Sequence, residues 1–260
     1  MIEMMIEARR KDLGGFEVGR VLPFHLRRMV GPFIFLDQMG PAEFAPGADN
    51  INVRPHPHIG LSTLTYLFEG EILHHDNTGA NQAIRPGEVN WMTAGSGIVH
   101  SERTDPLKKA KGGPMHGMQA WIALPDEAEE TNPSFHHFGE DAQPAYDDKG
   151  LFARLVAGEA YGAKAAAPTH SPLFYLHWEL AEGVRTAPPP GRSFRKSGDG
   201  YSERALYVPK GRIEVGDRVF EAGQMAVLEP TAEPTVKALE PSTVMALGGE
   251  PVGQRLIWWN

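Results

Sequence analysis

The chain has 260 residues, of which 41% are hydrophobic and 22% charged, and its formal net charge is −8 at pH 7. This is the balance of a globular protein with a sizeable core, and the length allows one large or two small domains. The acidic balance, without any cluster of Lys and Arg, argues against nucleic acid as a partner. Because the sequence has no Cys, a metal site would have to be built from His and carboxylate side chains.

The N-terminus carries no sign of a targeting segment. Residues 1–7 are too few and too acidic for the apolar region of a signal peptide. No apolar run in the sequence is long enough to span a bilayer. We therefore expect a cytoplasmic protein without a membrane partner.

Turn-forming residues are frequent, with 29 Gly and 22 Pro scattered through the sequence. Short alternating apolar stretches between them predict many short strands, and hence an all-β sandwich or barrel. Residues 59–73 alternate around Glu69 and Gly70, so we expect two antiparallel strands joined at that turn. Further strands are expected at residues 89–92, 98–102 and 119–124.

Residues 126–150 differ from their surroundings because they are acidic and rich in turn formers. This segment is the best candidate for a linker, although Phe135 and Phe138 could pack it against a barrel. After it, strands are expected at residues 151–159 and 173–180, and a further array between residues 205 and 228. Residues 160–167 are short and Ala-rich, and we expect a loop there.

The two halves of the chain repeat one pattern in outline. The sequence YLFEG at residues 66–70, followed by RPGE at 85–88, has a counterpart in YVPKG at 207–211, followed by EAGQ at 221–224. The spacing differs, so the repeat is weak by itself, but it favours two related β-domains over one large domain. We expect these domains to occupy residues 1–130 and 131–260.

Two pairs of polar residues in expected strands suggest a metal site: His56 with His58, and His100 with Glu102. Side chains two apart on a strand point the same way, so each pair can direct two ligands at one point. Three imidazoles and a carboxylate would leave two open positions on an octahedral Fe(II) ion, whereas a tetrahedral zinc site would be closed. Histidine pairs of this kind also occur on surfaces, so these residues alone leave both interpretations open.

Longer segments around these pairs resemble the pirin family of the cupin superfamily. They are RPHPHIGLSTLTYLFEGEIL from Arg54 and IRPGEVNWMTAGSGIVHSE from Ile84, with RMVGPF from Arg28 and THSPLFY from Thr169. The resemblance covers essentially the whole chain. It implies a bicupin, in which two jelly-roll β-barrels pack together. Since relatives of this type usually continue beyond Trp259 and Asn260, we also expect a C-terminal tail that this sequence lacks.

The resemblance also implies where the metal binds. The family's metal ligands match His56, His58, His100 and Glu102, so the N-terminal barrel would hold one divalent ion per chain. The expected ion is Fe(II), with Mn, Co, Ni, Cu and Zn as the other candidates. The C-terminal barrel would hold none, and no His follows His177.

Two functions are compatible with this resemblance. The first is an oxidoreductase of the quercetinase type, a metal-dependent dioxygenase that opens a flavonol such as quercetin with O₂, with Glu102 as the catalytic base. The second is a metal-bound regulatory or redox-sensing protein that acts through a protein partner. Oxygen uptake that depends on a flavonol would discriminate between them.

Other polar residues carry weaker signals. His74 and His75 end an expected strand, and we expect them to be solvated or hydrogen-bonded, with the rim of the cavity as the alternative. His116 and Gln119 precede a strand and either line the pocket or satisfy buried backbone groups.

Overall fold

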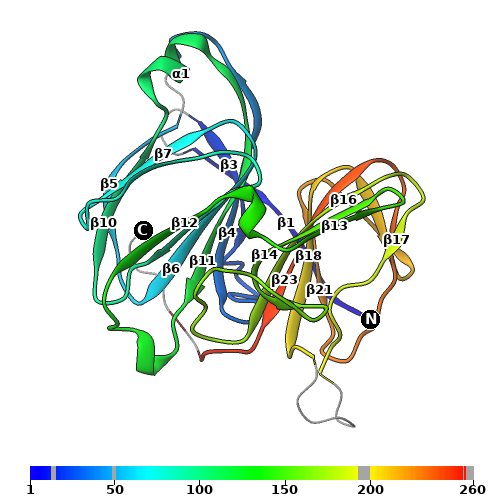
Figure 1. Cartoon of the computed structure of the whole chain (residues 1–260). Helices are drawn as coiled ribbons and strands as arrows, with labels where there is room; N and C mark the ends of the chain where they lie inside the picture. Colours follow the sequence, from blue (N-terminus) through cyan, green and yellow to red (C-terminus); the bar gives the residue numbers. More distant parts are fainter. Residues whose placement is uncertain (13–15, 49–50, 193–199, 254, 256–260) are drawn as a thin grey trace. The chain divides into compact units, whose positions relative to one another are not determined.

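The structure is a computed structural model that describes residues 1–12, 16–48, 51–192, 200–253 and 255 (Figure 1). The C-terminal residues for which a tail was expected lie outside this described part. The chain forms two compact units. What we call the N-terminal unit contains Arg9–Pro23 and Phe33–Glu140, and the C-terminal unit contains Met1–Ala8, Phe24–Pro32 and Asp141–Val252.

The N-terminal unit is built from a large and a small antiparallel sheet. The large sheet has the order β12 (Ser134–Phe138), β9 (Val89–Thr93), β6 (Leu61–Glu69), β11 (Gly113–Ala123), β4 (Phe33–Phe44), β3 (Glu17–Leu22) and β2 (Arg9–Asp12). The small sheet has the order β5 (Asn52–His58), β10 (Ile98–Arg103), β7 (Ile72–Asp76) and β8 (Asn81–Ile84). The expected strands at residues 89–92, 98–102 and 119–124 are confirmed.

The C-terminal unit follows the same plan. Its large sheet has the order β1 (Ile2–Glu7), β21 (Gln224–Leu228), β18 (Glu203–Lys210), β23 (Ser242–Gly249), β16 (Leu173–Leu180), β14 (Leu151–Ala160) and β13 (Ala145–Asp148), and β15 (Ala163–Lys164) pairs with β14. Its small sheet has the order β17 (Arg185–Thr186), β22 (Val236–Ala238), β19 (Arg212–Val215) and β20 (Arg218–Glu221).

The repeat seen in the sequence corresponds to the same turns in both units. Gly70 and Gly211 each leave a strand of the large sheet with φ of 92° and 87°, a conformation that glycine adopts without steric cost. Further on, the Gly87 amide donates to the Leu67 carbonyl at 3.1 Å, and the Gly223 amide donates to the Val208 carbonyl at 2.8 Å. The two units are therefore related β-domains, as the pattern predicted.

The expected hairpin in residues 59–73 is wrong in one respect. Both strands exist, as β6 and β7, and the turn lies at Gly70. However, β6 pairs with β9 and β11 in the large sheet, whereas β7 pairs with β8 and β10 in the small one. The turn at Gly70 therefore carries the chain from the large sheet to the small sheet of the sandwich.

The segment 126–150 is not a free linker. It contains β12, which pairs with β9, and β13, which pairs with β14. Phe135 packs against the buried residues Met92, Ala94 and Ile98. Most of its acidic residues lie in or next to the short 3-10 segments Asp126–Ala128 and Glu140–Ala142 or on the exposed strand β13, and the apolar contacts of Phe135 hold β12 in place.

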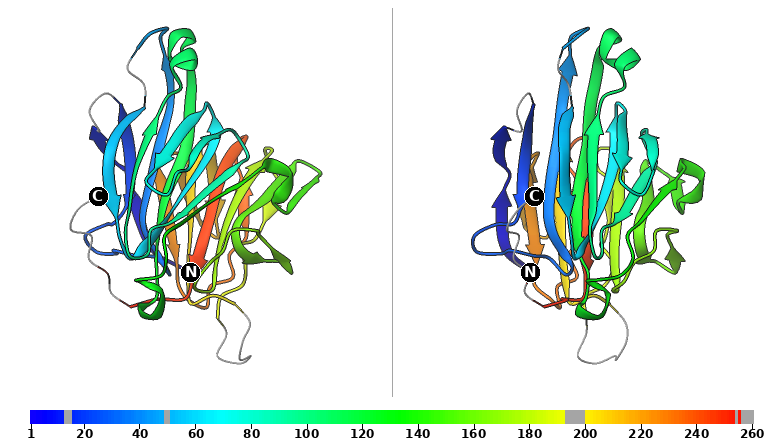
Figure 2. Two further views of the ribbon diagram at one scale, coloured as in Figure 1. Left: turned by 60° about the vertical axis from the view of Figure 1, so that its left-hand side comes forward. Right: turned by 90° about the vertical axis from the view of Figure 1, so that its left-hand side faces the viewer.

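Helical structure is limited to short segments in the described residues. The helix α1 (Pro106–Lys111) begins at Asp105, whose side chain accepts hydrogen bonds from the first turn as an N-cap. It lies beside the long strands β4 and β11, which run next to each other (Figure 2). In the part of the chain that is described, no helix is long and apolar enough to cross a membrane.

Each unit has its own hydrophobic core. In the N-terminal unit, Leu67, Ile72, Ile84 and Met115 belong to a cluster that fills one end of the sandwich. In the C-terminal unit a larger cluster extends through the space between both sheets and includes Phe220 and Trp178. Polar side chains are also buried in the N-terminal unit, among them His58, His74, His100 and Glu102.

Candidate metal centre

Three histidines from the small sheet of the N-terminal unit form a compact cluster. His56 and His58 lie on β5, and His100 is the direct cross-strand partner of His56 on β10. The ring centroids lie 4.4 Å apart for His56 and His100, 4.9 Å for His58 and His100, and 4.8 Å for His56 and His58. One potential ligand atom from each ring lies within 4.8 Å of the others. The spacing of two along a strand thus brings the imidazoles together, as expected.

Hydrogen bonding fixes which nitrogen of His56 is available. Its Nδ1 lies 2.8 Å from the Arg54 carbonyl, which can only accept, so Nδ1 carries the proton. Nε2 therefore has the lone pair that a metal ion needs. His56 is also partly exposed, whereas His58 and His100 are each only 2% exposed, so the cluster is reached from the His56 side.

A hydrogen-bonded chain from Asp76 through His74 likewise determines which nitrogen of His100 carries a proton. The carboxylate of Asp76 accepts a hydrogen bond from Nε2 of His74 at 2.8 Å, which leaves Nδ1 of His74 as an acceptor. That atom lies 3.4 Å from Nδ1 of His100, which must be the donor. Nε2 of His100 is then left with its lone pair, and it is buried without a hydrogen-bond partner among the described residues. Second-shell partners of this kind orient the ligands of metal sites.

The pKa values of His100 and Asp76 agree with this assignment of the protons. Burial and, to a smaller extent, the neighbouring imidazoles of His56, His58 and His74 together lower the pKa of His100 to about 2. Burial raises the pKa of Asp76, but hydrogen bonds from His74 and from its own turn outweigh this effect, so its pKa is lowered overall. His100 is thus neutral and Asp76 ionised at neutral pH, which is the state that binds metal.

Glu102 lies beside the cluster, two residues after His100. It is 9% exposed, and its Oε1 accepts from the hydroxyl of Thr65 on β6 at 3.3 Å. Burial raises the pKa of Glu102, while His74, His56 and hydrogen bonds from Thr65 and Gln119 lower it in part. A buried carboxylate with a raised pKa is stabilised in its charged form by a nearby cation, which suits a position next to a metal ion.

The large sheet supplies an aromatic wall opposite the histidines. Trp121 meets His58 edge to face, with ring centroids 4.9 Å apart, and stacks on Phe35 at 3.9 Å. The guanidinium of Arg20 lies 4.5 Å from the Phe35 centroid and forms a bidentate ion pair with Asp37, with contacts of 2.9 and 2.8 Å. The wall next to the cluster is thus flat and mostly apolar, with one ion pair at its far end.

The donor set fits a divalent metal ion. Three neutral imidazoles are common ligands for Fe, Ni, Cu and Zn, and His100 Nε2 is a buried atom that needs a partner. Within the described residues, these histidines are the one group of His and acidic side chains with ligand atoms close enough to hold a metal. They form a site for one metal ion.

The other polar residues are placed as follows. His74 is hydrogen-bonded, which is one of the roles expected for it, and it is 4% exposed and stacks on Phe135 at 4.3 Å, so it lies in the interior rather than at the rim or in solvent. Gln119 accepts from the Thr65 hydroxyl at 2.8 Å beside Glu102, so its side chain bonds a side chain of the site rather than a backbone group. His116 instead contacts Gln38, with 2.9 Å between their Nε2 atoms.

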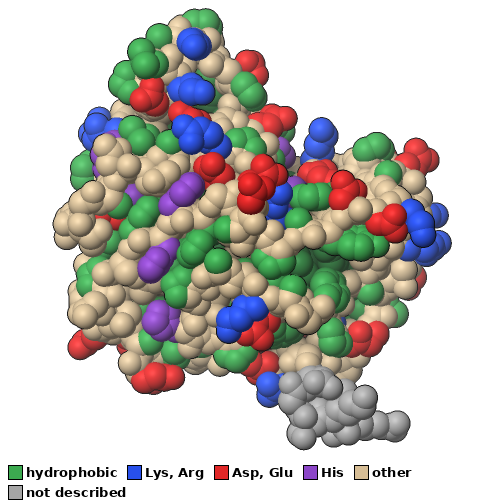
Figure 3. Space-filling model, viewed as in Figure 1, with side chains coloured by type: hydrophobic (Ala, Val, Ile, Leu, Met, Phe, Trp, Pro, Cys, Tyr) green, Lys and Arg blue, Asp and Glu red, His purple; other side chains and the backbone are tan. Residues whose placement is uncertain are grey.

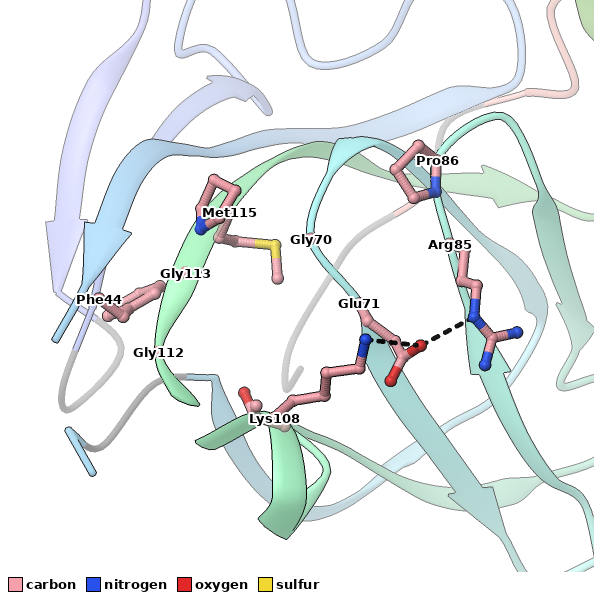
Figure 4. A pocket seen from close by; sticks show the side chains of 11 residues that line it. Phe44, Gly70, Glu71, Arg85, Pro86, Lys108, Gly112, Gly113 and Met115 are labelled. Carbon is pink, nitrogen blue, oxygen red and sulfur yellow. Dashed lines mark ion pairs between the residues drawn. The ribbon is translucent and has the colours of Figure 1, made fainter. Parts of the chain in front are cut away.

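A separate cavity of about 290 Å³ lies where the turn at Gly70 meets α1 and the start of β11 (Figure 4). Arg85 and Lys108 point at Glu71 across it, with Oε2 of Glu71 2.8 Å from Nε of Arg85 and 3.9 Å from Nζ of Lys108. None of the three clustered histidines lines this cavity. Because the ionised side chains of this cavity already pair with one another, the histidine cluster is the stronger candidate site.

The fold and the cluster together define a class of protein. Two β-sandwich barrels with the same strand order, one of which carries a three-histidine site, make a bicupin with a single cupin-type metal site. The pirin family model matches residues 15–122, and the model of the pirin C-terminal cupin domain matches residues 177–260. The chain belongs to the pirin family. The first match ends before residue 130 and the second begins after residue 131. The expected division of the chain into domains at residues 1–130 and 131–260 stays a proposal.

Several known proteins are similar to this chain, and some of them are named after an enzymatic activity. A pirin-like protein of Caulobacter vibrioides is 60% identical over 262 residues, covering 100% of this chain and 88% of the relative. A crystal structure of quercetin 2,3-dioxygenase from Acinetobacter baumannii is 33% identical, with a TM-score of 0.87 over 99% of this chain and 82% of that one. A bacterial pirin from Escherichia coli in complex with nickel(II) has a TM-score of 0.72 at 17% identity over 96% of this chain and all of its own, a likeness of fold alone.

Proposed function

We propose that this protein is a metal-dependent dioxygenase that uses O₂ to open a flavonol such as quercetin. The observation that carries the proposal is the buried cluster of His56, His58 and His100 with the carboxylate of Glu102 beside it. The similarity to a quercetin 2,3-dioxygenase over nearly the whole chain supports the same substrate class.

His56, His58, His100 and Glu102 would hold the ion, and Fe(II) is the one that this donor set suits best. When bound, such an ion supplies Lewis-acid and O₂ chemistry with open coordination positions. The tautomers assigned above direct Nε2 of His56 and of His100 toward the ion. The Asp76–His74 pair keeps His100 in that tautomer and so positions the ligand.

Glu102 would also serve as the base. Because a bound cation favours the charged form of this carboxylate, Glu102 would act as a base when it is only weakly bound to the ion or released from it. It would take the proton of the flavonol 3-hydroxyl, and the Thr65 hydroxyl at 3.3 Å holds the carboxylate in place. Trp121 and Phe35 provide an apolar aromatic wall that excludes water and suits the flat rings of a flavonol.

Oxygen uptake tests this proposal directly. The protein is first loaded with Fe(II) in the absence of oxygen. When it is then transferred to aerated buffer, addition of quercetin should start O₂ consumption at a rate proportional to the metal bound. Loading with Mn, Co, Ni, Cu or Zn in parallel identifies the metal that supports turnover. If fully loaded protein takes up no O₂ with a flavonol for any of these metals, the regulatory or redox-sensing function becomes the better hypothesis.

A further inference from the structure

The C-terminal unit contains a cavity of about 520 Å³, and its described residues include no cluster of metal-ligating side chains. One wall is the inner face of its large sheet, where Ala153 and Leu155 of β14 lie next to Leu176 and Trp178 of β16. The other wall includes Thr186 of the short strand β17. Figure 3 shows hydrophobic side chains gathered in a hollow on the face where β13, β14 and β17 lie. This volume falls in the range of pockets that bind small molecules.

The lining of this cavity carries no charged side chain. It consists of Ala, Leu, Pro and Thr together with three aromatic residues, Tyr146, Tyr161 and Trp178. A charged ligand would lose its hydration here without gaining a counter-charge, so the cavity selects against ions. The flat faces and edges of the aromatic side chains favour a planar aromatic partner.

Tyr161, which lines the cavity, has an unusual backbone conformation. The segment expected to be a loop is a tight hairpin in which Ala160 pairs with Ala163, with Tyr161 at φ 52° and Gly162 at φ 80° between them. Such turns favour Gly or Asn at both central positions, and a bulky residue with positive φ is strained. Nevertheless, the Tyr161 hydroxyl donates to the Ala187 carbonyl at 2.6 Å, and both residues line the cavity.

Strain held at one position suggests that the side chain there has a function. We propose that this cavity binds an uncharged planar aromatic molecule, with Trp178 in its wall and Tyr161 as the side chain that closes over it. The inference is independent of the dioxygenase activity, because all of its residues belong to the unit without the metal cluster. The cavity is a concave space walled by two sheets, which suits a small molecule better than a protein surface.

Two probes with the same ring system and different charge test the proposal. The metal-loaded protein should bind 2-naphthol, which is neutral at pH 7, with a measurable heat in isothermal titration calorimetry. It should bind 2-naphthoate at least about tenfold more weakly, since the carboxylate has no counter-charge. No binding of 2-naphthol, or equal binding of both probes, would overturn the proposal.

Variants locate the binding. Ala163→Phe, at a partly exposed position of the lining, should reduce 2-naphthol binding at least about tenfold by filling the cavity. The double variant His56→Ala/His100→Ala should bind the probe as the wild type does. Loss of probe binding in the histidine variant with retention in Ala163→Phe would place the site in the other barrel and refute the inference.

A second variant keeps the test decisive even if the filled cavity disturbs folding. Tyr161→Asn should raise the melting temperature or leave it unchanged, because Asn tolerates positive φ, while it weakens 2-naphthol binding at least about tenfold. A tyrosine with only a structural role would give the opposite result, with a lower melting temperature and unchanged binding. That outcome would contradict the proposal.

Discussion

The two barrels share one plan and differ mainly in their small sheets. In the N-terminal unit, β5 has seven residues and β10 has six, and these strands carry the three histidines and Glu102. The strands at the same places in the C-terminal unit, β17 and β22, have two and three residues. The large sheets keep the same order and the same turn glycines. Metal chemistry therefore depends on the small sheet, and the large sheet is the common scaffold.

The register makes the comparison specific. His74 and Val215 follow their turn glycines, Gly70 and Gly211, at the same distance along the chain. The cross-strand partner of His74 is Glu102, and that of Val215 is Val236. Both valines are completely buried. Where one barrel has an acid and an imidazole beside a metal site, the other has a pair of valines, so the same scaffold position serves either chemistry or packing.

The largest expected effect tests whether the metal belongs to one barrel only. His56→Ala/His100→Ala should reduce tightly bound metal from about one ion per chain to near zero, because a single imidazole of the cluster remains. Elemental analysis of purified protein measures this. The matched control is His177→Ala in the C-terminal unit, where the histidine bonds Glu179 at 2.8 Å. Metal loss in the control, or metal retained in the double variant, would show that the metal is not bound by the N-terminal barrel alone.

The next effect concerns Glu102, which the C-terminal barrel replaces by valine. Glu102→Gln should keep much of the metal, since three imidazoles remain, yet lower flavonol-dependent O₂ uptake per bound metal by about 10²–10⁴-fold, the usual contribution of a general base. Oxygen-electrode rates divided by metal content give the answer. Thr65→Val, which removes the hydroxyl that contacts both Glu102 and Gln119 and leaves the carboxylate in place, should lose less activity. If Glu102→Gln is fully active per metal, Glu102 is not the base.

A smaller effect is expected at His74. His74→Val introduces the residue of the other barrel and removes the partner that fixes the His100 tautomer, so metal affinity should fall about 10–100-fold. Competition with a chelator measures the affinity. His75→Val on the same strand is the control and should bind metal as the wild type does. Equal losses in both variants would mean that His74 has no specific role.

The last effect is a pH dependence of the metal-free protein. The pKa of His100 falls from an ordinary value of 6.5 to about 2 in the folded state, so between these pH values the unfolded chain binds a proton that the folded one does not. Stability should therefore decrease as pH falls below about 6.5, by up to about 1.4 kcal/mol per pH unit. Urea unfolding across this range measures the slope. His100→Gln should reduce it by about one proton, whereas the exposed His136→Gln should not.

The parts of the fold and site that depend on local spacing could be predicted from the sequence. Residues two apart on a strand share a face, so the joint orientation of His56 and His58 follows from their positions alone. The turn glycines and the related halves were also visible. The role of the four residues as metal ligands stays a proposal that the clustering of three of them supports.

The remaining features depend on pairing between distant strands. The place of His74 in the interior follows from its register opposite Glu102, 28 residues later, and no local pattern reports that register. The pairing of Arg20 with Asp37 likewise requires β3 and β4 to be adjacent. The turn at Gly70 identified two strands but not their sheets, because the same turn chemistry serves a hairpin and a crossing between sheets.

The pairing of β1 with β21 has a consequence for how the protein is made. Ile2 lies opposite Leu228, and the N-terminal ammonium forms an ion pair with Glu229 at 2.7 Å. During synthesis on the ribosome at 5–20 residues per second, the first strand therefore waits roughly 10–45 seconds for its partner to be translated. The segments from Arg9 to Glu140 that build the metal-binding barrel are complete long before that. The C-terminal unit is thus the last to close.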